Sequence, residues 1–563
     1  MKLKKVYVLD LETCNSENNI LQENTRVWLW DICDITTFSH TTGNNIETLI
    51  EKLKEIAPAT VYTHNLKFDG LFIMDYIMKH GFKYSEKKSL HENEFTTLIT
   101  NINMFYSMSI CFEAKNKKTK KQIEFRDSSK KIKGTVRQIA IDYNLPILKG
   151  EIDYTLERDE NYVATPEEIK YIHNDTEIIA RVLNIQYDQG LNRLTIASDV
   201  FDMYKKFCGT KFKYLFPTLP IEIDDFIRES YRGGICLVNE KYKSKMIDDV
   251  KVYDVNSMHA YQMSCKLLPY SHPEYYKGKY VTNKVYPLYI QKIKVCCKLK
   301  ENHIPTILLE ELWFKLDAEY LVDTAGEMVQ LTLTNVDLEL LFEHYEIFDI
   351  KYIDGFMFMG SHNLFRNFIQ PIYNKKCEST GAIKETNKML LVGLYGKFAT
   401  SPRHKNKIPY IENNVICFMN TELEVGEPVY TAVSAFISAY ARQELCHAIQ
   451  SNYDNFIYCD TDSIHLTQDA KGIEIDNKKL GAWKFESASD PIIQAMYLAP
   501  KTYMQLTQSY KENKKISGCP DTVKRQINFD NFKYNQSFNG KLMPKKVNGG
   551  VVLVDNVYTI RMR

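Results

Sequence analysis

The chain has 563 residues, of which 44% are hydrophobic, and its 72 Lys and Arg residues balance its 71 Asp and Glu residues to a formal net charge of +1. This composition excludes intrinsic disorder as the main state, and the length predicts roughly three to five structural units. No uncharged apolar run approaches the roughly 20 residues of a membrane helix, and Asp10 interrupts the first apolar run too early for a signal peptide. We therefore expect a cytosolic protein without a membrane partner. Its 13 Cys residues, odd in number and without a CxxC pair, predict mostly buried, reduced thiols.

Charge is distributed unevenly along the chain. Residues 115–137 hold ten basic and two acidic residues, and residues 511–546 hold nine basic and three acidic residues. Residues 317–349 hold nine acidic residues without Lys or Arg. The two basic stretches are candidate contacts for a polyanion, although solvated surface faces would give the same pattern.

Alternating strands and helices are predicted for the first 190 residues. Apolar runs predict strands at Val6–Leu9 and Ala59–Thr63. A helix is predicted from Thr165 to Leu183, because Thr165 is a good N-cap, Pro166 suits the first helical position and Glu168 completes a capping box. The pattern indicates an α/β domain with acidic residues at strand ends.

The rest of the chain mixes strands, helices and one polar segment. The predicted elements are a turn at Tyr231–Gly234, a strand at Val250–Val255, a strand-rich segment over residues 266–363, a basic helical stretch over Phe365–Phe398, a polar loop rich in Pro and Asn over residues 401–428, and strands over Phe456–Leu466.

Four carboxylates in the first 190 residues form one candidate site. Asp10 and Glu12 are two apart on a predicted strand and so point to the same side, and Asp69 follows the next strand. Asp175 lies four residues after Tyr171, so these two share a helical face. One such fragment alone would fit a solvated strand end. Together the four predict two Mg²⁺ ions about 4 Å apart and hydrolysis of a phosphodiester, with Tyr171 orienting the water.

A second carboxylate set lies later in the chain. Asp254 ends the strand at Val250–Val255, and Tyr458–Ser463 is flanked by apolar residues, as in a hairpin that presents Asp460 and Asp462 at a tight turn. Their alternate spacing could place both beside one metal site, although a turn can change this. The segment alone would also fit an Asp-rich turn. With Asp254 it predicts a two-metal site.

A stripe of Lys384, Lys388, Leu391 and Tyr395 supplies positive charge. The spacings of 4, 3 and 4 residues place these side chains on one narrow helical face. A triphosphate would satisfy the lysines and the Tyr ring could pack on a base, whereas the alternative is a solvated basic face. The second carboxylate set therefore has the parts for adding a nucleotide, and the first has the parts for removing one.

In combination and in order, these residues resemble the motifs of protein-primed family B DNA polymerases of small bacteriophages, and the resemblance spans essentially the whole chain. Three segments, Asp10–Glu12, Asn65–Asp69 and Tyr171–Asp175, resemble the exonuclease motifs of the family's proofreading domain, and Lys149 resembles the lysine of that site. The segments that resemble the YxGG segment and the polymerase motifs A, B, C and KxY are Tyr231–Gly234, Asp254–Ser257, Lys388–Gly396, Tyr458–Ser463 and Lys501–Tyr503.

The resemblance implies a role for each of these residues. The implied catalytic residues are Asp254, Asp460 and Asp462 for polymerisation, and Asp10, Glu12, Asp69, Asp175, Tyr171 and Lys149 for the exonuclease. The implied metal ligands are the seven carboxylates together with Val255. The implied nucleotide contacts are Val255, His259, Lys376, Lys384, Lys388, Tyr395 and Tyr458. The implied DNA contacts are His64, Asn65, Phe68, Ser128, Tyr231, Arg232, Gly233, Gly234, Thr461, Lys501 and Tyr503.

The implied fold is a multidomain α/β protein, with an RNase H-like 3′-5′ exonuclease domain and a right-hand polymerase that carries two subgroup-specific insertions. The implied domains are the exonuclease (1–194), first part of the palm (195–265), first insertion for terminal-protein and DNA contact (266–363), fingers (364–399), second insertion for processivity and strand displacement (400–431), second part of the palm (432–520) and thumb (521–563). Both basic stretches could then line the DNA path. We expect the carboxylates of residues 317–349 to face away from the duplex or toward a basic primer protein.

Two motifs depart from the family pattern. Motif A has His259 where the family usually has a Tyr that excludes ribose, so ribonucleotide exclusion is less certain here. Motif B has Val392 and Gly393 where the family usually has Asn and Ser, which removes two hydrogen-bonding side chains near the nucleotide.

The sequence thus predicts a DNA-templated DNA polymerase with a 3′-5′ proofreading exonuclease, which replicates a linear phage genome from a terminal protein in the host bacterial cytoplasm. The expected cofactors are two Mg²⁺ or Mn²⁺ ions per active site, with dNTPs as substrates. The expected partners are template, primer and displaced DNA and the terminal protein, for a monomer or a heterodimer with that protein. Alternatives are a DNA-primed repair polymerase without terminal protein, and a nonenzymatic DNA-binding protein that keeps the fold.

Overall fold

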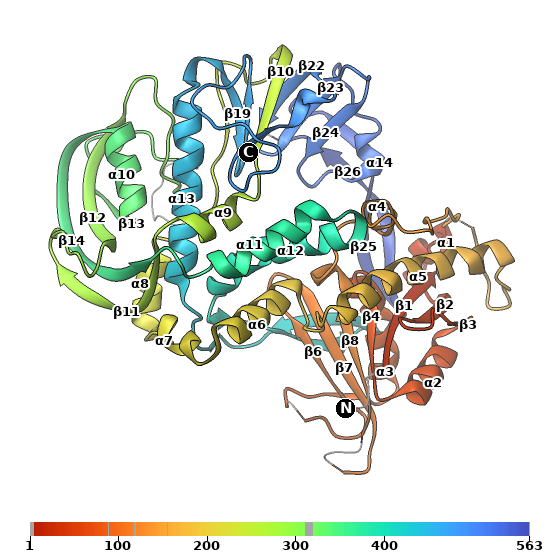
Figure 1. Cartoon of the computed structure of the whole chain (residues 1–563). Helices are drawn as coiled ribbons and strands as arrows, with labels where there is room; N and C mark the ends of the chain where they lie inside the picture. Colours follow the sequence, from red (N-terminus) through yellow and green to blue (C-terminus); the bar gives the residue numbers. More distant parts are fainter. Residues whose placement is uncertain (1–4, 88, 117–119, 155, 310–318, 562–563) are drawn as a thin grey trace.

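Three larger β-sheets, together with several long helices and three two-stranded sheets, organise the described part of the chain (Figure 1). The computed structural model describes residues 5–87, 89–116, 120–154, 156–309 and 319–561. None of the helices in these ranges is long and apolar enough to cross a membrane. All 13 Cys residues are free thiols, and most are buried, as predicted.

The N-terminal sheet has the strand order β3-β2-β1-β4-β8-β7-β6-β5. Its strands are β1 (Lys5–Thr13), β2 (Val27–Asp34), β3 (His40–Gly43), β4 (Ala59–Thr63), β5 (Lys83–Tyr84), β6 (Glu94–Ile99), β7 (Phe105–Ala114) and β8 (Lys120–Asp127). The main helices on it are α2 (Ile46–Ile56), α3 (Leu66–Lys79) and α5 (Pro166–Asp188). The two predicted strands are confirmed. The predicted helix is also confirmed, with its capping box between Thr165 and Glu168.

The central sheet has the strand order β24-β23-β22-β10-β20-β19-β9, with β21 paired to β10. Its strands are β9 (Cys236–Val238), β10 (Met246–Val255), β19 (Phe456–Asp460), β20 (Ser463–Leu466), β21 (Trp483–Phe485), β22 (Ile492–Ala499), β23 (Thr502–Thr507) and β24 (Glu512–Ile516). Helix α9 (Met258–Cys265) follows β10, and the long, largely buried helix α13 (Thr431–Gln450) precedes β19. The sheet therefore brings β10 beside a hairpin that lies about 200 residues later in the chain.

The third sheet comprises residues of the segment 266–363, which is strand-rich as predicted. It has the order β11-β14-β12-β13 and is covered by helix α10 (Asn335–His344). Its strands are β11 (Leu268–Lys277), β12 (Leu288–Leu299), β13 (Val329–Thr334) and β14 (Tyr345–Ser361). A buried ion pair between Arg442 of α13 and Asp337 of α10, 2.8 Å apart, fastens this sheet to the centre of the molecule. Asp337 is thus a core residue, so of the two orientations expected for the carboxylates of 317–349 it cannot face a primer protein.

Two helices occupy the predicted basic helical stretch. Helices α11 (Arg366–Glu378) and α12 (Gly381–Phe398) are separated by a short break after Glu378. Helix α12 packs on α6 (Ile196–Cys208), and a Cβ added at Gly393 would lie 3.1 Å from Cα of Ala197 on α6. Gly393 therefore permits a close contact between the two helices. The sequence had indicated only that a hydrogen-bonding side chain is missing at this position.

The prediction of a polar loop over residues 401–428 is wrong, because this segment forms four short strands. These are β15 (Arg403–His404), which pairs with β18 (Glu424–Val425), and β16 (Lys407–Glu412), which pairs with β17 (Val415–Asn420). Asn413 and Asn414 both have positive φ, of 50° and 62°. Consecutive residues with positive φ are typical of a tight two-residue hairpin turn, and Asn tolerates this conformation better than most residues.

The β16–β17 hairpin packs on β6 and α3, and the C-terminal hairpin packs on α3 and on α1 (Glu17–Leu21). Strands β25 (Ser537–Val547) and β26 (Gly550–Thr559) form the C-terminal hairpin. Ile416 of β17 and Val551 of β26 are buried in the same hydrophobic core as Phe72 and Phe105 of the N-terminal unit. Gly550, with φ of 147°, approaches so closely that an added Cβ would lie 2.5 Å from the Phe72 ring.

The basic stretch over residues 115–137 only partly fits the expectation of a DNA-lining surface. Lys117 and Lys118 lie outside the described residues. Lys131 is fully buried in an ion pair with Asp199 of α6, and its ammonium also donates to the carbonyl oxygens of Leu191 (3.1 Å) and Arg193 (3.2 Å). Lys131 therefore joins the N-terminal unit to α6 and is not a DNA contact, which corrects the expectation for this residue.

Two candidate active sites

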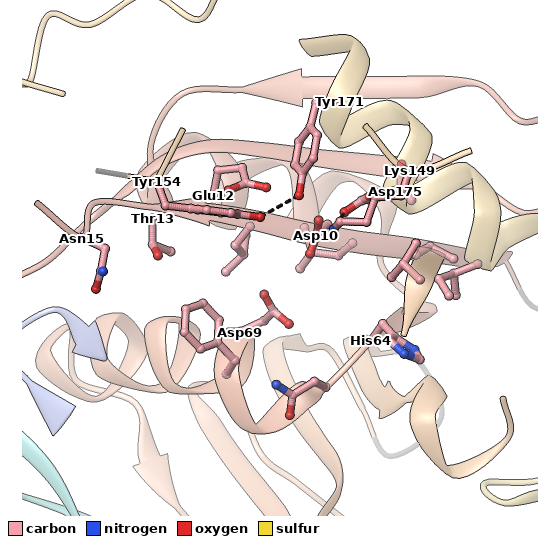
Figure 2. Close-up of a pocket in the computed structure, with 18 of the residues that line it drawn as sticks. Asp10, Glu12, Thr13, Asn15, His64, Asp69, Lys149, Tyr154, Tyr171 and Asp175 are labelled. Carbon is pink, nitrogen blue, oxygen red and sulfur yellow. Dashed lines mark hydrogen bonds and ion pairs between the residues drawn. The ribbon is translucent and has the colours of Figure 1, made fainter. Parts of the chain in front are cut away.

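A cleft of about 420 Å³ opens beside β1, α3 and α5 and gathers the first carboxylate set. Asp10 and Glu12 project from β1, Asp69 lies in the first turn of α3, and Tyr171 and Asp175 project from α5 (Figure 2). Asn65, with φ of 86°, turns the chain sharply between β4 and α3. This left-handed turn brings Asp69 opposite β1.

Burial and mutual repulsion raise the pKa values of these carboxyl groups. The pKa of Asp10 is raised to about 7, chiefly by burial and then by Asp175. Burial, followed by the charge of Asp10, also raises the pKa of Glu12 and of Asp69 well above the usual values. A site that disfavours its own negative charges in this way favours a cation between them.

One lysine and two tyrosines complete the chemistry of the cleft. Lys149 forms an ion pair with Asp175, and its ammonium lies 4.9 Å from the centre of the Tyr171 ring. The hydroxyls of Tyr171 and Tyr154 share a hydrogen bond of 2.7 Å (Figure 2). Tyr154 was not predicted from the sequence. The only available signal was its place five residues after Lys149 in the same loop.

The predicted DNA contacts of this cleft differ in their access. Asn65 is exposed, and His64 and Phe68 are partly exposed, and all three line the cleft. Ser128 is completely buried and shares a 2.9 Å hydrogen bond with Nδ1 of His64, whose Nε2 donates to the carbonyl oxygen of Gly134 at 2.9 Å. Ser128 therefore holds the His64 ring in place, and its own side chain does not reach the surface. Leu542 and Leu553 of the C-terminal hairpin also line the cleft.

The second candidate site lies where β10 meets the β19–β20 hairpin. Asp254 of β10 is in register with Ser463 of β20, and the N–H of Val255 donates to the carbonyl oxygen of Asp462 at 2.8 Å. Thr461, in the turn between β19 and β20, has φ of 58°, which makes this turn tight. The fold thus brings the predicted carboxylates, Asp254, Asp460 and Asp462, to one sheet edge.

The pKa values of the second set are raised for the same reasons. The pKa of Asp254 is raised to about 7 by burial and then by Asp462. The pKa of Asp462 is raised to about 6 by burial and then by Asp460. Lys501 lies 3.4 Å from the carboxylate of Asp460. The donor set again suits hard divalent cations.

Three predicted lysines lie near one another, and one of them, Lys376, lies near Asp254. Lys376 of α11 donates to the hydroxyl of Ser257 at 3.0 Å. Its pKa is lowered, chiefly by burial and also by the charges of Lys388 and Lys384 on α12. Lys384 and Lys388 are exposed, which the alternative of a solvated basic face would also predict. Leu391 of the same stripe is buried, so the stripe is not solvated along its whole length. Like charges held together beside carboxylates fit a polyanionic ligand.

The predicted glycine segment passes directly against the carboxylate turn. A Cβ added at Gly234 would lie 2.9 Å from Cγ2 of Thr461, and the N–H of Thr461 donates to the carbonyl oxygen of Ile235 at 2.8 Å. Gly233 is exposed and has open space around it. Tyr231 is partly exposed.

Two predicted ligand contacts are buried, which corrects the expectation that their side chains touch nucleotide or DNA. Arg232 donates to the carbonyl oxygens of Leu308 and Thr332, and so braces the third sheet. Tyr458 is fully buried, and its hydroxyl accepts a 3.1 Å hydrogen bond from the N–H of Lys501. Tyr458 packs 5.2 Å from the ring of Tyr503, so it supports the segment that carries Lys501 and Tyr503.

Comparisons with known proteins agree with this geometry. The family model described as DNA polymerase type B, organellar and viral, matches residues 54–479. The DNA polymerase of Bacillus phage B103 is 42% identical over 98% of this chain and 99% of its own, and that of Streptococcus phage Cp-1 is 30% identical over 99% and 98%. The structure of the phi29 DNA polymerase complexed with primer-template DNA is 39% identical, covers 99% of this chain and 100% of its own, and superposes with a TM-score of 0.93.

The chain therefore belongs to the type B DNA polymerases of organelles and viruses, and it is a DNA-directed DNA polymerase. The fold as a whole is that of a multidomain α/β polymerase. The similar phi29 enzyme has also been solved with incoming nucleotide substrates and with single-stranded DNA.

Proposed function

We propose that this polymerase replicates a linear phage genome from a protein primer inside the host cell, and that it proofreads. In this proposal, the central-sheet site adds nucleotides and the N-terminal cleft removes them from a 3′ end. The observation that carries the proposal is that one chain holds two separate carboxylate sites. One has Lys376 beside it, with Lys384 and Lys388 near that lysine, and the other has Tyr171 and Lys149.

The proposed domains follow the three sheets. Residues 1–194 form an RNase H-like exonuclease, the central sheet forms the palm, helices α11 and α12 form the fingers, and residues 521–563 form the thumb. The third sheet is the first insertion, and strands β15–β18 are the second. The superposition on the phi29 enzyme supports this division because it covers the whole chain.

Divalent ions suit both sites, and Mg²⁺ or Mn²⁺ is the proposed occupant, two per site. In the central site the ligands would be Asp254, Asp462 and the main chain of Val255, with Asp460 alongside. In the cleft they would be Asp10, Glu12, Asp69 and Asp175. Oδ1 of Asp175 is buried without a hydrogen-bonding partner, as expected for an atom that a cation satisfies. When bound, such ions activate an attacking oxygen and stabilise a leaving oxygen.

The protein's own residues orient the polymerisation reaction. The triphosphate is neutralised by Lys376, Lys384 and Lys388. Without these lysines, the carboxylates of the site would repel the triphosphate anion. Tyr395 packs on the nascent base pair, and His259 lies under the sugar. Lys501 and Tyr503 hold the primer strand, and the Gly233–Gly234 segment with Thr461 lets the template pass close to the backbone.

In the cleft, the chain's residues select and position a single-stranded 3′ end. His64, Asn65 and Phe68 line the entrance, and Ser128 fixes the His64 ring. Tyr171, held by Tyr154, orients the attacking water. Lys149 keeps Asp175 in place and balances part of the charge there.

A pair of variants tests the division of labour. Asp462→Asn is expected to abolish nucleotide addition and to spare degradation of single-stranded 3′ ends. The double variant Asp10→Ala, Glu12→Ala is expected to do the reverse. Extension by Asp462→Asn at a normal rate would refute the central site. Loss of both activities in either variant would point to misfolding, which circular dichroism checks.

Enclosure of DNA is the proposed role of the second insertion and the thumb. The β16–β17 hairpin contacts both β6 and the C-terminal hairpin, and Lys546 lies 4.8 Å from the centre of the Phe418 ring. These contacts link residues 400–431, the thumb and the exonuclease into a continuous wall. We expect removal of the β16–β17 hairpin to shorten the products of strand-displacement synthesis.

The acidic face of the first insertion is the proposed contact for a basic terminal protein. Glu339, Glu343, Glu346 and Asp349 are exposed, whereas Asp317 lies outside the described residues. Replacing Glu339, Glu346 and Asp349 by neutral residues should weaken nucleotide transfer to the terminal protein more than extension of plain DNA. Equal effects on both reactions would reject this contact.

Two assays separate the alternatives. Primer extension with Mg²⁺, dNTPs and a DNA primer excludes a nonenzymatic DNA-binding protein if nucleotides are added. Incubation with the candidate terminal protein and one labelled dNTP then distinguishes protein priming from a DNA-primed repair polymerase. Absence of covalent label under conditions that support primer extension would remove the protein-priming proposal and leave the polymerase.

A further inference from the structure

A compact group of imidazole and carboxylate side chains lies beside the N-terminal cleft, outside both carboxylate sites. Asp31 comes from β2, His40 from β3 and His173 from α5. One possible ligand atom from each of the three side chains lies within 4.8 Å of the other two. Among the described residues, no other group of three His, Cys, Asp or Glu side chains meets this condition. Glu177 lies next to it, with a carboxylate oxygen 3.7 Å from Nε2 of His40.

The distances within the group suit a small tetrahedral ion. Nδ1 of His40 lies 2.8 Å from Oδ2 of Asp31, and Nε2 of His173 lies 3.5 Å from Oδ1 of the same residue. The two imidazole rings stack with centroids 4.1 Å apart. Ligands bound to Zn²⁺ at about 2.0–2.1 Å in a tetrahedron are roughly 3.4 Å from one another. An ion would replace the hydrogen bond of His40 Nδ1 to Asp31 (2.8 Å) and that of His173 Nε2 to the Thr42 hydroxyl (2.8 Å).

The surroundings of Asp31 resemble the outer partners of a metal ligand. Asp31 is completely buried, and its carboxylate accepts hydrogen bonds from the hydroxyls of Thr176 (2.6 Å) and Thr42 (3.1 Å). Hydrogen bonds of this kind orient a coordinating carboxylate. His40 and His173 are 17% and 30% exposed, so an ion has a route from solvent.

We propose that Asp31, His40 and His173, assisted by Glu177, bind one Zn²⁺ ion or a similar transition-metal ion. Two nitrogen donors and one or two carboxylates favour such an ion, whereas the oxygen-only sites of the two active centres favour Mg²⁺. This site is therefore chemically distinct from both active centres, although it is close to one of them.

The position of the site indicates its effect on the molecule. Asp31 is the register partner of Asp10 across β1 and β2, and Thr176 directly follows Asp175 on α5. An ion bound here joins α5 to β2 and to the edge strand β3. It therefore braces the helix that presents Tyr171 and Asp175 to the cleft, and we expect it to raise the thermal stability of the N-terminal unit.

Metal binding can be measured on the full-length chain with its active-site carboxylates disabled. In an Asp10→Ala, Glu12→Ala, Asp462→Asn background, equilibrium dialysis against micromolar Zn²⁺ should give one ion per chain. Co²⁺ should give intense visible absorption, typical of tetrahedral coordination with nitrogen ligands. Absence of bound Zn²⁺ in this background overturns the proposal, and so does Co²⁺ absorption of the weak, octahedral type.

Variants of the imidazoles locate the ion. His40→Asn, His173→Asn in the same background should lose the bound ion and the rise in melting temperature on adding Zn²⁺. His91→Asn, which changes an exposed histidine elsewhere, should keep both. Unchanged Zn²⁺ uptake by the double variant would show that the ion binds elsewhere and would overturn the proposal. If the double variant does not fold, His173→Asn alone and the Co²⁺ spectrum of the background chain decide the question.

Discussion

His259 and Tyr395 stack face to face, with ring centroids 4.1 Å apart and ring planes 3° apart. One ring comes from α9, which follows the strand of Asp254, and the other comes from the lysine-bearing helix α12. Burial lowers the pKa of His259 to about 4, so its imidazole is neutral at physiological pH. The two rings lie one behind the other beside the proposed nucleotide site, and His259 is smaller than the Tyr usual in the family.

The first prediction concerns discrimination against ribonucleotides. His259→Ala removes one ring of the stack and should lower the preference for dNTPs over rNTPs by about tenfold, equivalent to about 1.4 kcal/mol. His259→Tyr should preserve or increase the preference. The measurement is kcat/KM for single-nucleotide incorporation of each substrate. An unchanged ratio in His259→Ala would mean that this ring does not contact the sugar.

The second prediction concerns pH and divalent ions. Because burial and Asp462 raise the pKa of Asp254 from 3.8 to about 7, the folded protein keeps a proton that the unfolded chain has lost. The stability that this group contributes is thus present at low pH and is lost as pH rises through about 7. Mg²⁺ competes with that proton, so the rise in melting temperature on adding Mg²⁺ should be larger at about pH 8 than at about pH 5.5.

Asp254→Asn is the control for this pH dependence. The variant lacks the titrating group, so the difference between the two pH values should shrink. A Mg²⁺ effect of equal size at both pH values in the unsubstituted protein would contradict the assignment of the raised pKa values to the metal sites.

The third prediction concerns the buried pair of Lys131 and Asp199. Lys131→Met leaves the Asp199 carboxylate buried without its cation, and should destabilise the protein by about 3–5 kcal/mol. The double variant Lys131→Met, Asp199→Leu removes both charges and should recover much of this loss. Urea unfolding followed by tryptophan fluorescence measures both. A double variant as unstable as the single one would show that the pair matters through packing instead of charge.

The fourth prediction concerns the contact of Gly234 with Thr461. Gly234→Ala introduces a Cβ 2.9 Å from Cγ2 of Thr461, so it should displace the carboxylate turn and lower nucleotide addition at least tenfold while sparing the N-terminal cleft. Gly233→Ala has open space and should leave the melting temperature unchanged. Combining Gly234→Ala with Thr461→Ala removes both clashing atoms, Cγ2 and Oγ1 of Thr461, and should restore part of the polymerase rate. No rescue would place the effect elsewhere.

Local patterns in the sequence were enough to predict most of the carboxylates that the fold gathers at the two candidate sites. Asp10 and Glu12 followed from strand alternation, and Asp175 followed from the helix spacing to Tyr171. Tyr154 could not be predicted, because its bond to Tyr171 depends on the path of a loop. The group formed by Asp31, His40 and His173 was missed for a similar reason, since its members come from three separate elements and show no spacing pattern.

The errors have equally local causes. The segment over residues 401–428 contains strands of at most six residues between Pro and Asn, so its alternation was too short to outweigh its loop-like composition. Ser128, Arg232 and Tyr458 were assigned ligand contacts through the family likeness alone. Their burial depends on contacts with distant segments, such as that of Arg232 with Thr332, which no pattern in the chain encodes.

The shared core of the N-terminal unit limits how this protein can be divided. Ile416 and Val551 pack into the hydrophobic core of the N-terminal unit, whose other buried members lie within the first 190 residues. Gly550 packs against the Phe72 ring. A fragment that ends at residue 194 would leave these apolar positions open to water. Such a fragment should be prone to aggregate, so we do not expect the proposed nuclease to fold as an independent module. Point substitution is therefore the workable route to separating the two proposed activities.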